Sequence, residues 1–308
     1  MPLRPESAPR RVVLHFGPPK TGTSALQAWC AAHRKALASH QVHYASFDRE
    51  DDPKHQWLVK DLRSGRFDRL QSEVGRFSTG TLILSCEGVM VHRHQFAAAH
   101  WAGFRDILSG CDTALFLVRR QTEDWVRSLW RQSVLNPGPH GGVAVPALDR
   151  FSRAPQLLEM AALPELAARM AKDCGAGRIV IAPYEGDWLA QFRDLARVPQ
   201  EVGPDTLPRV HETPPDDFVQ LYRVLAAGQA DVGPLRRALF ALYCRAMPTT
   251  NLTLQHSASD FALSDPAEQS RHLTDLAARL GVLANSQSPT RQLAESLARS
   301  ATDWLARL

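Results

Sequence analysis

The stretch Gly17-Pro18-Pro19-Lys20-Thr21-Gly22-Thr23-Ser24 directly follows the apolar run of residues 12–16. A glycine, four residues, a second glycine and a hydroxyl pair have the outline of a phosphate loop, in which backbone N–H groups and a helix start surround phosphate oxygens. The usual lysine of such a loop follows the second glycine, but that place is Thr23 and the lysine of this loop is Lys20. The sequence therefore predicts an anion-binding turn between a strand and a helix, with its cation displaced.

A second motif follows another apolar run, residues 115–118. The chain there reads Arg119-Arg120-Gln121-Thr122-Glu123-Asp124-Trp125-Val126-Arg127-Ser128, so Ser128 stands eight residues after Arg120. An arginine at a strand end can make charge-assisted hydrogen bonds to a phosphate, and a serine two helical turns further on can add a hydroxyl. A shift of one residue in the register would exchange the roles of Arg119 and Arg120.

Together the two motifs resemble those of sulfotransferases, the enzymes that use 3'-phosphoadenosine 5'-phosphosulfate (PAPS). The loop is similar to their 5'-phosphosulfate loop, and Arg120 with Ser128 is similar to their grip on the 3'-phosphate. The sequence Arg119-Arg120-Gln121 at the strand end resembles that of a bacterial sulfotransferase-like branch of the family. The resemblance covers about residues 11–200. It implies a P-loop NTPase-like sulfotransferase fold, an α/β fold in which a parallel β-sheet is flanked by helices.

The resemblance also implies which residues hold the cofactor. They are Pro19, Lys20, Thr21, Gly22, Thr23, Ser24, Arg120, Ser128, Tyr184 and Arg209. Lys20 would stand near the oxygen that bridges sulfur and phosphorus, where negative charge develops. Tyr184 falls where the family has a Tyr-Glu-Asp near the adenine, although Gly186 replaces the acid. Arg209 is the candidate for a late basic loop of the family, which in this chain lacks the expected glycine.

The catalytic base is expected just after the strand at residues 81–86. Sulfotransferases carry a histidine or glutamate there, and Glu87 has that position in this chain. A carboxylate in a crevice can remove a proton from a hydroxyl group, but an acid at this place can equally cap the following helix. His92 and His94 are alternative bases. They form a His-x-His pair without a carboxylate or cysteine at a convincing ligand spacing, so we expect no metal.

The order of apolar runs indicates the domain organisation. Residues 1–10 are expected to form a flexible tail. In residues 11–202, strands alternate with helical patterns, which predicts parallel βαβ units in an α/β core. Residues 203–308 contain helical patterns only and are expected to form a helical extension packed on the core. The loops at residues 48–54 and 136–142 are the expected acceptor-specificity loops, and the composition of the second would allow it to act as a lid.

Bulk composition limits the classes of function. The chain has 308 residues, of which 44% are hydrophobic and 22% charged, as in globular proteins. A net charge of +4 suits an anionic ligand, but without a clustered basic stripe we expect no nucleic-acid partner. Five scattered cysteines indicate reduced thiols, and we find neither a signal peptide nor an apolar stretch of membrane-spanning length. We therefore expect a cytoplasmic protein; the oligomeric state stays open.

These observations predict a sulfotransferase that moves a sulfuryl group from PAPS to a hydroxyl or amine acceptor, with a saccharide favoured. The product would be adenosine 3',5'-bisphosphate (PAP), and no metal would be required. One alternative is a P-loop nucleotide kinase or NTPase, which would need a lysine in place of Thr23 and a strand-end aspartate for magnesium. Another alternative is a non-catalytic nucleotide-binding protein of the same fold.

Overall fold

The computed structural model describes residues 10–50, 52–135, 145–208, 214–227, 232–247, 261–262, 265–287 and 289–308. The chain divides into two compact units. The first takes in Met1–Trp125 and Pro155–Arg209, and the second takes in Val126–Ala154 and Val210–Leu308. The sequence puts a boundary near residue 202. The C-terminal part of the second unit starts at Val210, and the same unit also takes in Val126–Ala154 from inside the expected core.

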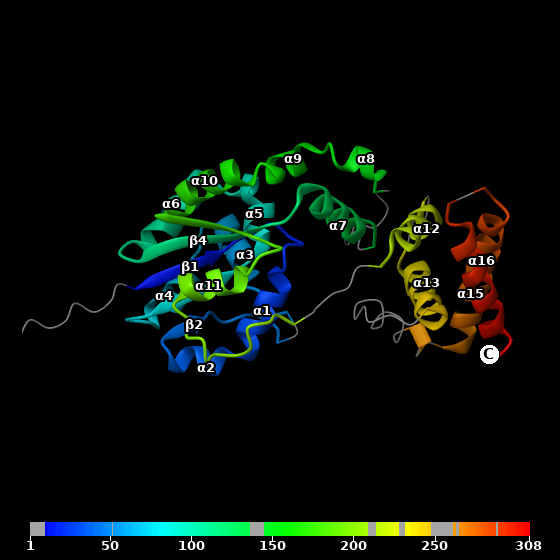
Figure 1. Ribbon diagram of the computed structural model, residues 1–308, viewed down its shortest axis with the longest axis horizontal. Helices are drawn as coiled ribbons and strands as arrows, with labels where there is room; N and C mark the ends of the chain where they lie inside the picture. The colour runs from blue at the N-terminus through cyan, green and yellow to red at the C-terminus, as the bar shows by residue number, and fades with distance from the viewer. Residues whose placement is uncertain are drawn as a thin grey trace, which may run out of the picture. The chain divides into compact units, whose positions relative to one another are not determined.

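A five-stranded sheet forms the centre of the first unit (Figure 1). Its strands are β1 (Arg11–His15), β2 (Val42–Tyr44), β3 (Thr81–Ser85), β4 (Asp112–Arg119) and β5 (Arg178–Pro183). Their order across the sheet is β2-β3-β1-β4-β5, and every pairing is parallel. The expected α/β class, with a parallel sheet and flanking helices, is thus confirmed.

Helices cover both faces of this sheet (Figure 1). The helices of the first unit are α1 (Thr23–Ala32), α2 (Arg34–Ser39), α3 (Trp57–Ser64), α4 (Asp68–Gly75), α5 (Glu87–Val91), η1 (Arg93–Gln95), α6 (Ala98–Leu108), α9 (Pro155–Ala161), α10 (Leu163–Cys174) and α11 (Trp188–Ala196). Val13 of β1 packs in a core with α1, α2 and α11. Val12 and Leu14 point the other way, into a core with α3, α6 and α10. Burial on both faces explains why β1 reads as a continuous apolar run.

The strand order places a switch point at β1. The chain leaves β1 toward β2 and returns through β3, whereas β4 and β5 lie on the other side of β1. In open parallel sheets, ligands bind outside the carboxyl ends of the strands where the order reverses. The residues that follow β1, β3, β4 and β5 are the loop at residues 17–22, Cys86-Glu87, Arg120 and Tyr184. All the candidate loops of the first unit therefore lie at one edge of the sheet.

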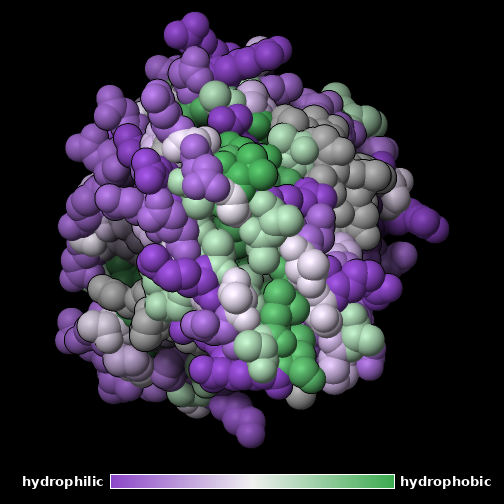
Figure 2. Space-filling view, turned by 90° about the vertical axis from the view of Figure 1, so that its right-hand side faces the viewer, coloured by the Kyte–Doolittle hydropathy of each residue, from purple (hydrophilic) through white to green (hydrophobic). Residues whose placement is uncertain are grey.

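The second unit consists of helices. Helix α7 (Thr122–Leu135) starts in the first unit and continues into the second, which also holds α8 (Leu148–Phe151), α12 (Asp216–Ala226), α13 (Gly233–Ala246), α15 (Pro266–Ala284) and α16 (Arg291–Leu305). Its core includes Trp130, Phe218, Tyr222 and Phe240. Figure 2 views the side on which α15 and α16 lie, and there a narrow apolar strip runs between polar side chains. Each of α12, α13, α15 and α16 buries apolar side chains in this core, as amphipathic helices do.

Candidate functional site

The turn between β1 and α1 has a strained backbone. Lys20 has φ 67° and Gly22 has φ 85°, and a positive φ is uncommon for any residue other than glycine. Such outliers cluster at binding and catalytic sites. Gly22 has no room for a side chain, because an added Cβ would lie 2.8 Å from a ring atom of Trp188. Thr21 Oγ1 donates a hydrogen bond of 2.7 Å to the Pro18 carbonyl and closes the turn.

The start of α1 has unsatisfied polar groups. Gly22 caps the helix without any side-chain hydrogen bond, and the first N–H groups of a helix have no partner inside it. Thr23 is only 2% exposed, and its Oγ1 has no hydrogen-bond partner in the part of the chain that the structure describes. A buried hydroxyl without a partner is costly. Together with the positive end of the helix dipole, these groups fit an anion with several oxygens.

Two cations and one carboxylate meet at this loop. Burial lowers the pKa of Lys20, the Arg120 guanidinium lowers it further, and the Glu87 carboxylate raises it. The three side chains come from three separate loops, and both Arg120 and Glu87 act on Lys20 through their charges. Among the described residues, neither Lys20 nor Arg120 forms an ion pair with a carboxylate. The site therefore carries positive potential that a bound anion would neutralise.

Tyr184 joins Arg120 to the loop. The Arg120 guanidinium lies 5.0 Å from the centre of the Tyr184 ring, within the range of a cation–π interaction. The Tyr184 N–H donates 2.8 Å to the Arg119 carbonyl at the ends of β4 and β5. A ring atom of Tyr184 lies 3.3 Å from where a Cβ of Gly22 would stand. Tyr184 thus contacts both halves of the candidate site, and it is 36% exposed.

Helix α7 is fixed to the loop at its first turn. Trp125 is buried, and its Nε1 donates 2.8 Å to the Pro19 carbonyl. Ser128 is buried one turn further along α7 and belongs to the second unit, so its pairing with Arg120 stays a prediction. Arg209 and the loop at residues 136–142 lie outside the described residues.

The structure groups Glu87 with Lys20. Glu87 is half-buried at the start of α5, where an acid also suits the positive helix end. His92 follows α5; burial lowers its pKa, and the charges of Arg63 and His94 lower it further. None of the described contacts joins His92 to Lys20, and His94 is exposed. Of the candidate bases, Glu87 is therefore the one beside the loop.

Three polar residues that sequence reasoning missed lie beneath the loop. His15 Nδ1 is 2.8 Å from Ser85 Oγ, and Gln27 Nε2 donates to the same oxygen at 3.1 Å. All three are buried, and burial lowers the pKa of His15 to about 3, so its imidazole is neutral. His15 stands inside an apolar strand, and Gln27 stands four residues after Thr23 on the buried face of α1. Polar residues at such apolar positions are the signal that identifies them.

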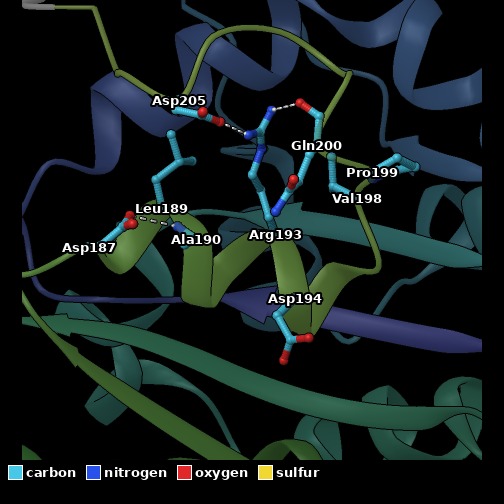
Figure 3. Close-up of a pocket in the computed structure, with 9 residues that line it drawn as sticks. All are labelled: Asp187, Leu189, Ala190, Arg193, Asp194, Val198, Pro199, Gln200 and Asp205. Carbon is cyan, nitrogen blue, oxygen red and sulfur yellow. Dashed lines mark hydrogen bonds and ion pairs between the residues drawn. The ribbon is translucent and has the colours of Figure 1, made fainter.

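A cavity of about 430 Å³ lies elsewhere in the first unit, beside α11. In Figure 3, Arg193 reaches from α11 toward Asp205 and Gln200, whereas Asp194 points away. The Arg193 guanidinium donates to Asp205 and to the carbonyls of Gln200, Val202 and Gly203. Its charge is neutralised and its N–H groups tie the following loop to the helix. The cavity therefore has a structural explanation, and we assign no ligand to it.

Comparisons with protein-family models, with curated proteins and with solved structures find no match to this chain. The residues that the structure describes contain no group of three or more histidine, cysteine, aspartate or glutamate side chains arranged to hold a metal ion. No helix in those ranges combines the length and the apolar character needed to cross a bilayer.

Proposed function

We propose that this chain is a PAPS-dependent sulfotransferase that transfers a sulfuryl group to a hydroxyl or amine acceptor, with a saccharide as the favoured acceptor. The observation that supports this most is the grouping of Lys20, Arg120 and Glu87 around the start of α1. Sulfuryl transfer needs an anion-binding loop, a cation where negative charge develops, and a group that accepts a proton. The grouping supplies all three. A P-loop NTPase-like sulfotransferase fold is part of the same proposal.

The residues at the site fit PAPS. The donor carries a 5'-phosphosulfate and a 3'-phosphate, and it supplies the sulfuryl group. The N–H groups at the start of α1 and the unpartnered Thr23 hydroxyl would hold the 5'-phosphate, with Ser24 beside them. Arg120 would bind the 3'-phosphate, and the exposed Tyr184 ring offers a surface for the adenine. Ser128 and Arg209 stay predicted contributors to this site.

Lys20 and Glu87 would perform the chemical work of the chain. The positive φ of Lys20 and its burial hold the ammonium beside the loop, where it would stabilise charge on the departing phosphate. Glu87 would accept the acceptor's proton. The Glu87 carboxylate also raises the pKa of Lys20 and so favours its charged form. No metal ion enters this scheme.

The alternative of a P-loop kinase or NTPase finds less support. Thr23 occupies the place of the usual lysine, and the residues after β4 are Arg119 and Arg120 where a magnesium-binding aspartate would be expected. Two adjacent arginines there suit a second phosphate group. A non-catalytic nucleotide-binding protein of the same fold would share all of these contacts, so only turnover separates it from a sulfotransferase.

Two measurements test the proposal. PAP should raise the melting temperature of the protein more than ATP with magnesium, because a 3'-phosphate site adds charge-assisted contacts and binding stabilises the folded state. Incubation with PAPS and a panel of hydroxyl, amine and saccharide acceptors should release PAP in an acceptor-dependent way. An equal or reversed ranking of the two nucleotides would contradict the proposal. Binding of PAP without turnover on any acceptor would favour the non-catalytic alternative.

A further inference from the structure

We infer that Gln27 is a positioning residue that orients the Glu87 carboxylate toward the acceptor. The inference rests on the proposed function, since it assigns a role at the same site. Gln27 lies on α1 and is 3% exposed. Its Nε2 donates 3.3 Å to Glu87 Oε2 and 3.1 Å to Ser85 Oγ. A single amide group therefore connects the candidate base to the end of strand β3.

The chemistry of the neighbours fixes which way the amide faces. An ionised carboxylate only accepts hydrogen bonds, so the amide nitrogen of Gln27, and not its oxygen, must point to Glu87. The two amide hydrogens are directed at two different acceptors, Glu87 and Ser85. Rotation of the Gln27 side chain would break both hydrogen bonds. The amide is therefore a fixed reference point for the carboxylate.

Ser85 is itself held from two sides. Its Oγ lies 2.8 Å from His15 Nδ1, and its backbone N–H donates 2.7 Å to His55 Nδ1. Both histidines are fully buried, and burial lowers the pKa of each to about 3. His55 therefore carries its proton on Nε2, which lies 3.1 Å from the Ala45 carbonyl. The Gln27 amide that holds the Glu87 carboxylate is therefore itself held by Ser85, a residue of the sheet whose own partners are buried histidines.

One helix carries both ends of this arrangement. Thr23 and Gln27 are four residues apart on α1, on the same face and separated by a rise of about 6 Å. Thr23 is the first residue of α1 after the anion-binding loop, and Gln27 Nε2 donates to the candidate base. The distance between the bound donor and the base would then be set by a rigid element. Loss of the Gln27 amide would let Glu87 leave its working position without changing the loop.

A double-mutant cycle on turnover tests this role. Gln27→Met keeps the size and burial of the side chain but removes its hydrogen bonds, and we expect kcat to fall about tenfold, the loss of one charge-assisted hydrogen bond. The Kd for PAP should stay within about twofold of the unmodified protein. In a Glu87→Gln background, Gln27→Met should cause no further fall in kcat, because it acts through the carboxylate that is already gone.

The matched control is Gln269→Met, in the second unit. Gln269 is also buried, and its amide donates 3.2 Å to the Ala262 carbonyl, without any described contact to Glu87. The kcat of the Gln269→Met variant should stay within about twofold of the kcat of the unmodified protein. A tenfold fall caused by Gln27→Met in both backgrounds would overturn the inference, since Gln27 would then act through the fold alone.

A parallel cycle on stability separates the inference from the proposed function. Unfolding in urea, followed by labelling of the buried Cys30 thiol, should show coupling between Gln27→Met and Glu87→Gln whether or not the protein turns over PAPS. Coupling in unfolding without wild-type turnover would overturn the proposed function, and the positioning role with it. Wild-type turnover without coupling in kcat would overturn the positioning role alone.

Discussion

Two places in the first unit hold a buried or half-buried cation, and they differ in what surrounds it. At the α11 cavity, Arg193 is 6% exposed, donates to one carboxylate and three carbonyls, and lies over the Trp29 ring at 5.1 Å. At the β1–α1 loop, Lys20 and Arg120 have no ion-pair partner among the described residues, and Thr23 Oγ1 has no hydrogen-bond partner there.

The difference shows what marks a binding site. The α11 cavity has a volume, but the charge of Arg193 is paired with a carboxylate, and both terminal nitrogens of its guanidinium donate to the protein. The loop has polar groups whose burial is costly without a partner, on a backbone held in a strained conformation. Cations without an ion-pair partner among the described residues, beside the start of a helix, therefore identify the site better than cavity size does. The following predictions test whether the two cations differ in function as they differ in surroundings.

The largest expected effect is on turnover at Lys20. Lys20→Ala should lower kcat about 100- to 1,000-fold, because it removes the cation that stabilises charge developing on the departing phosphate. The Kd for PAP should change far less, since that charge is largest in the transition state. Steady-state kinetics and calorimetry measure the two effects. Lys35→Ala removes an exposed lysine of α2 and serves as the control. Equal losses in kcat and affinity would make Lys20 a binding residue only.

The next effect is on stability at Arg193. Arg193→Met should lower the free energy of unfolding of the first unit by about 3 kcal/mol, because several carbonyl groups lose a charged donor. The Kd for PAP should not change. Urea unfolding with thiol labelling at Cys30 provides the measurement, and Asp194→Asn is the control from the same cavity. A PAP affinity that falls with Arg193→Met would mean that this cavity takes part in binding.

A smaller effect is expected on PAP affinity at Arg120. Arg120→Met should weaken PAP binding about 30-fold, as expected for the loss of a charge-assisted contact to a phosphate worth about 2 kcal/mol. Adenosine 5'-phosphate, which lacks the 3'-phosphate, should bind both proteins almost equally. Arg119→Met is the matched control, since Arg119 is the exposed neighbour. If Arg119→Met had the larger effect, the two arginines would exchange their roles.

The smallest effect per residue concerns pH and the buried histidines His15 and His55. Burial lowers the pKa of His15 and His55 from 6.5 to about 3, so the unfolded chain takes up protons below pH 6.5 while the folded chain does not. Stability contributed by the neutral imidazoles is therefore complete above 6.5 and falls as the pH falls toward 3. When the pH falls from about 7.5 to 5.5, each histidine should lower the free energy of unfolding by about 1.4 kcal/mol.

Urea unfolding of the first unit at these two pH values measures that loss. The double variant His15→Gln, His55→Gln should lose less stability on acidification than the unmodified protein, by about 3 kcal/mol. The exposed His40 is the control position, and His40→Gln should leave the pH dependence unchanged. An unmodified protein with no loss of stability over this range would show that the imidazoles are not held neutral by the fold.

The sequence by itself determined the α/β class and the place of the loop. The run of residues 12–16, apolar except for His15, suits a strand that is buried on both faces at the centre of a parallel sheet with helices on each side. The glycines and the hydroxyl pair after it specify a turn into a helix start. These features are local, because they depend on side-chain pattern and backbone freedom within a dozen residues.

Only the tertiary structure decided which distant residues meet. The sequence left Glu87, His92 and His94 as alternative bases, and the fold brings Glu87 beside Lys20. It could not show that Gln27 donates hydrogen bonds to both Ser85 and Glu87, since these depend on how α1 packs against β3. Long-range contacts depend on strand order and register, which pattern alone does not encode. The sequence therefore specified the kinds of side chain that the site can use, and the fold determined which of them come into contact.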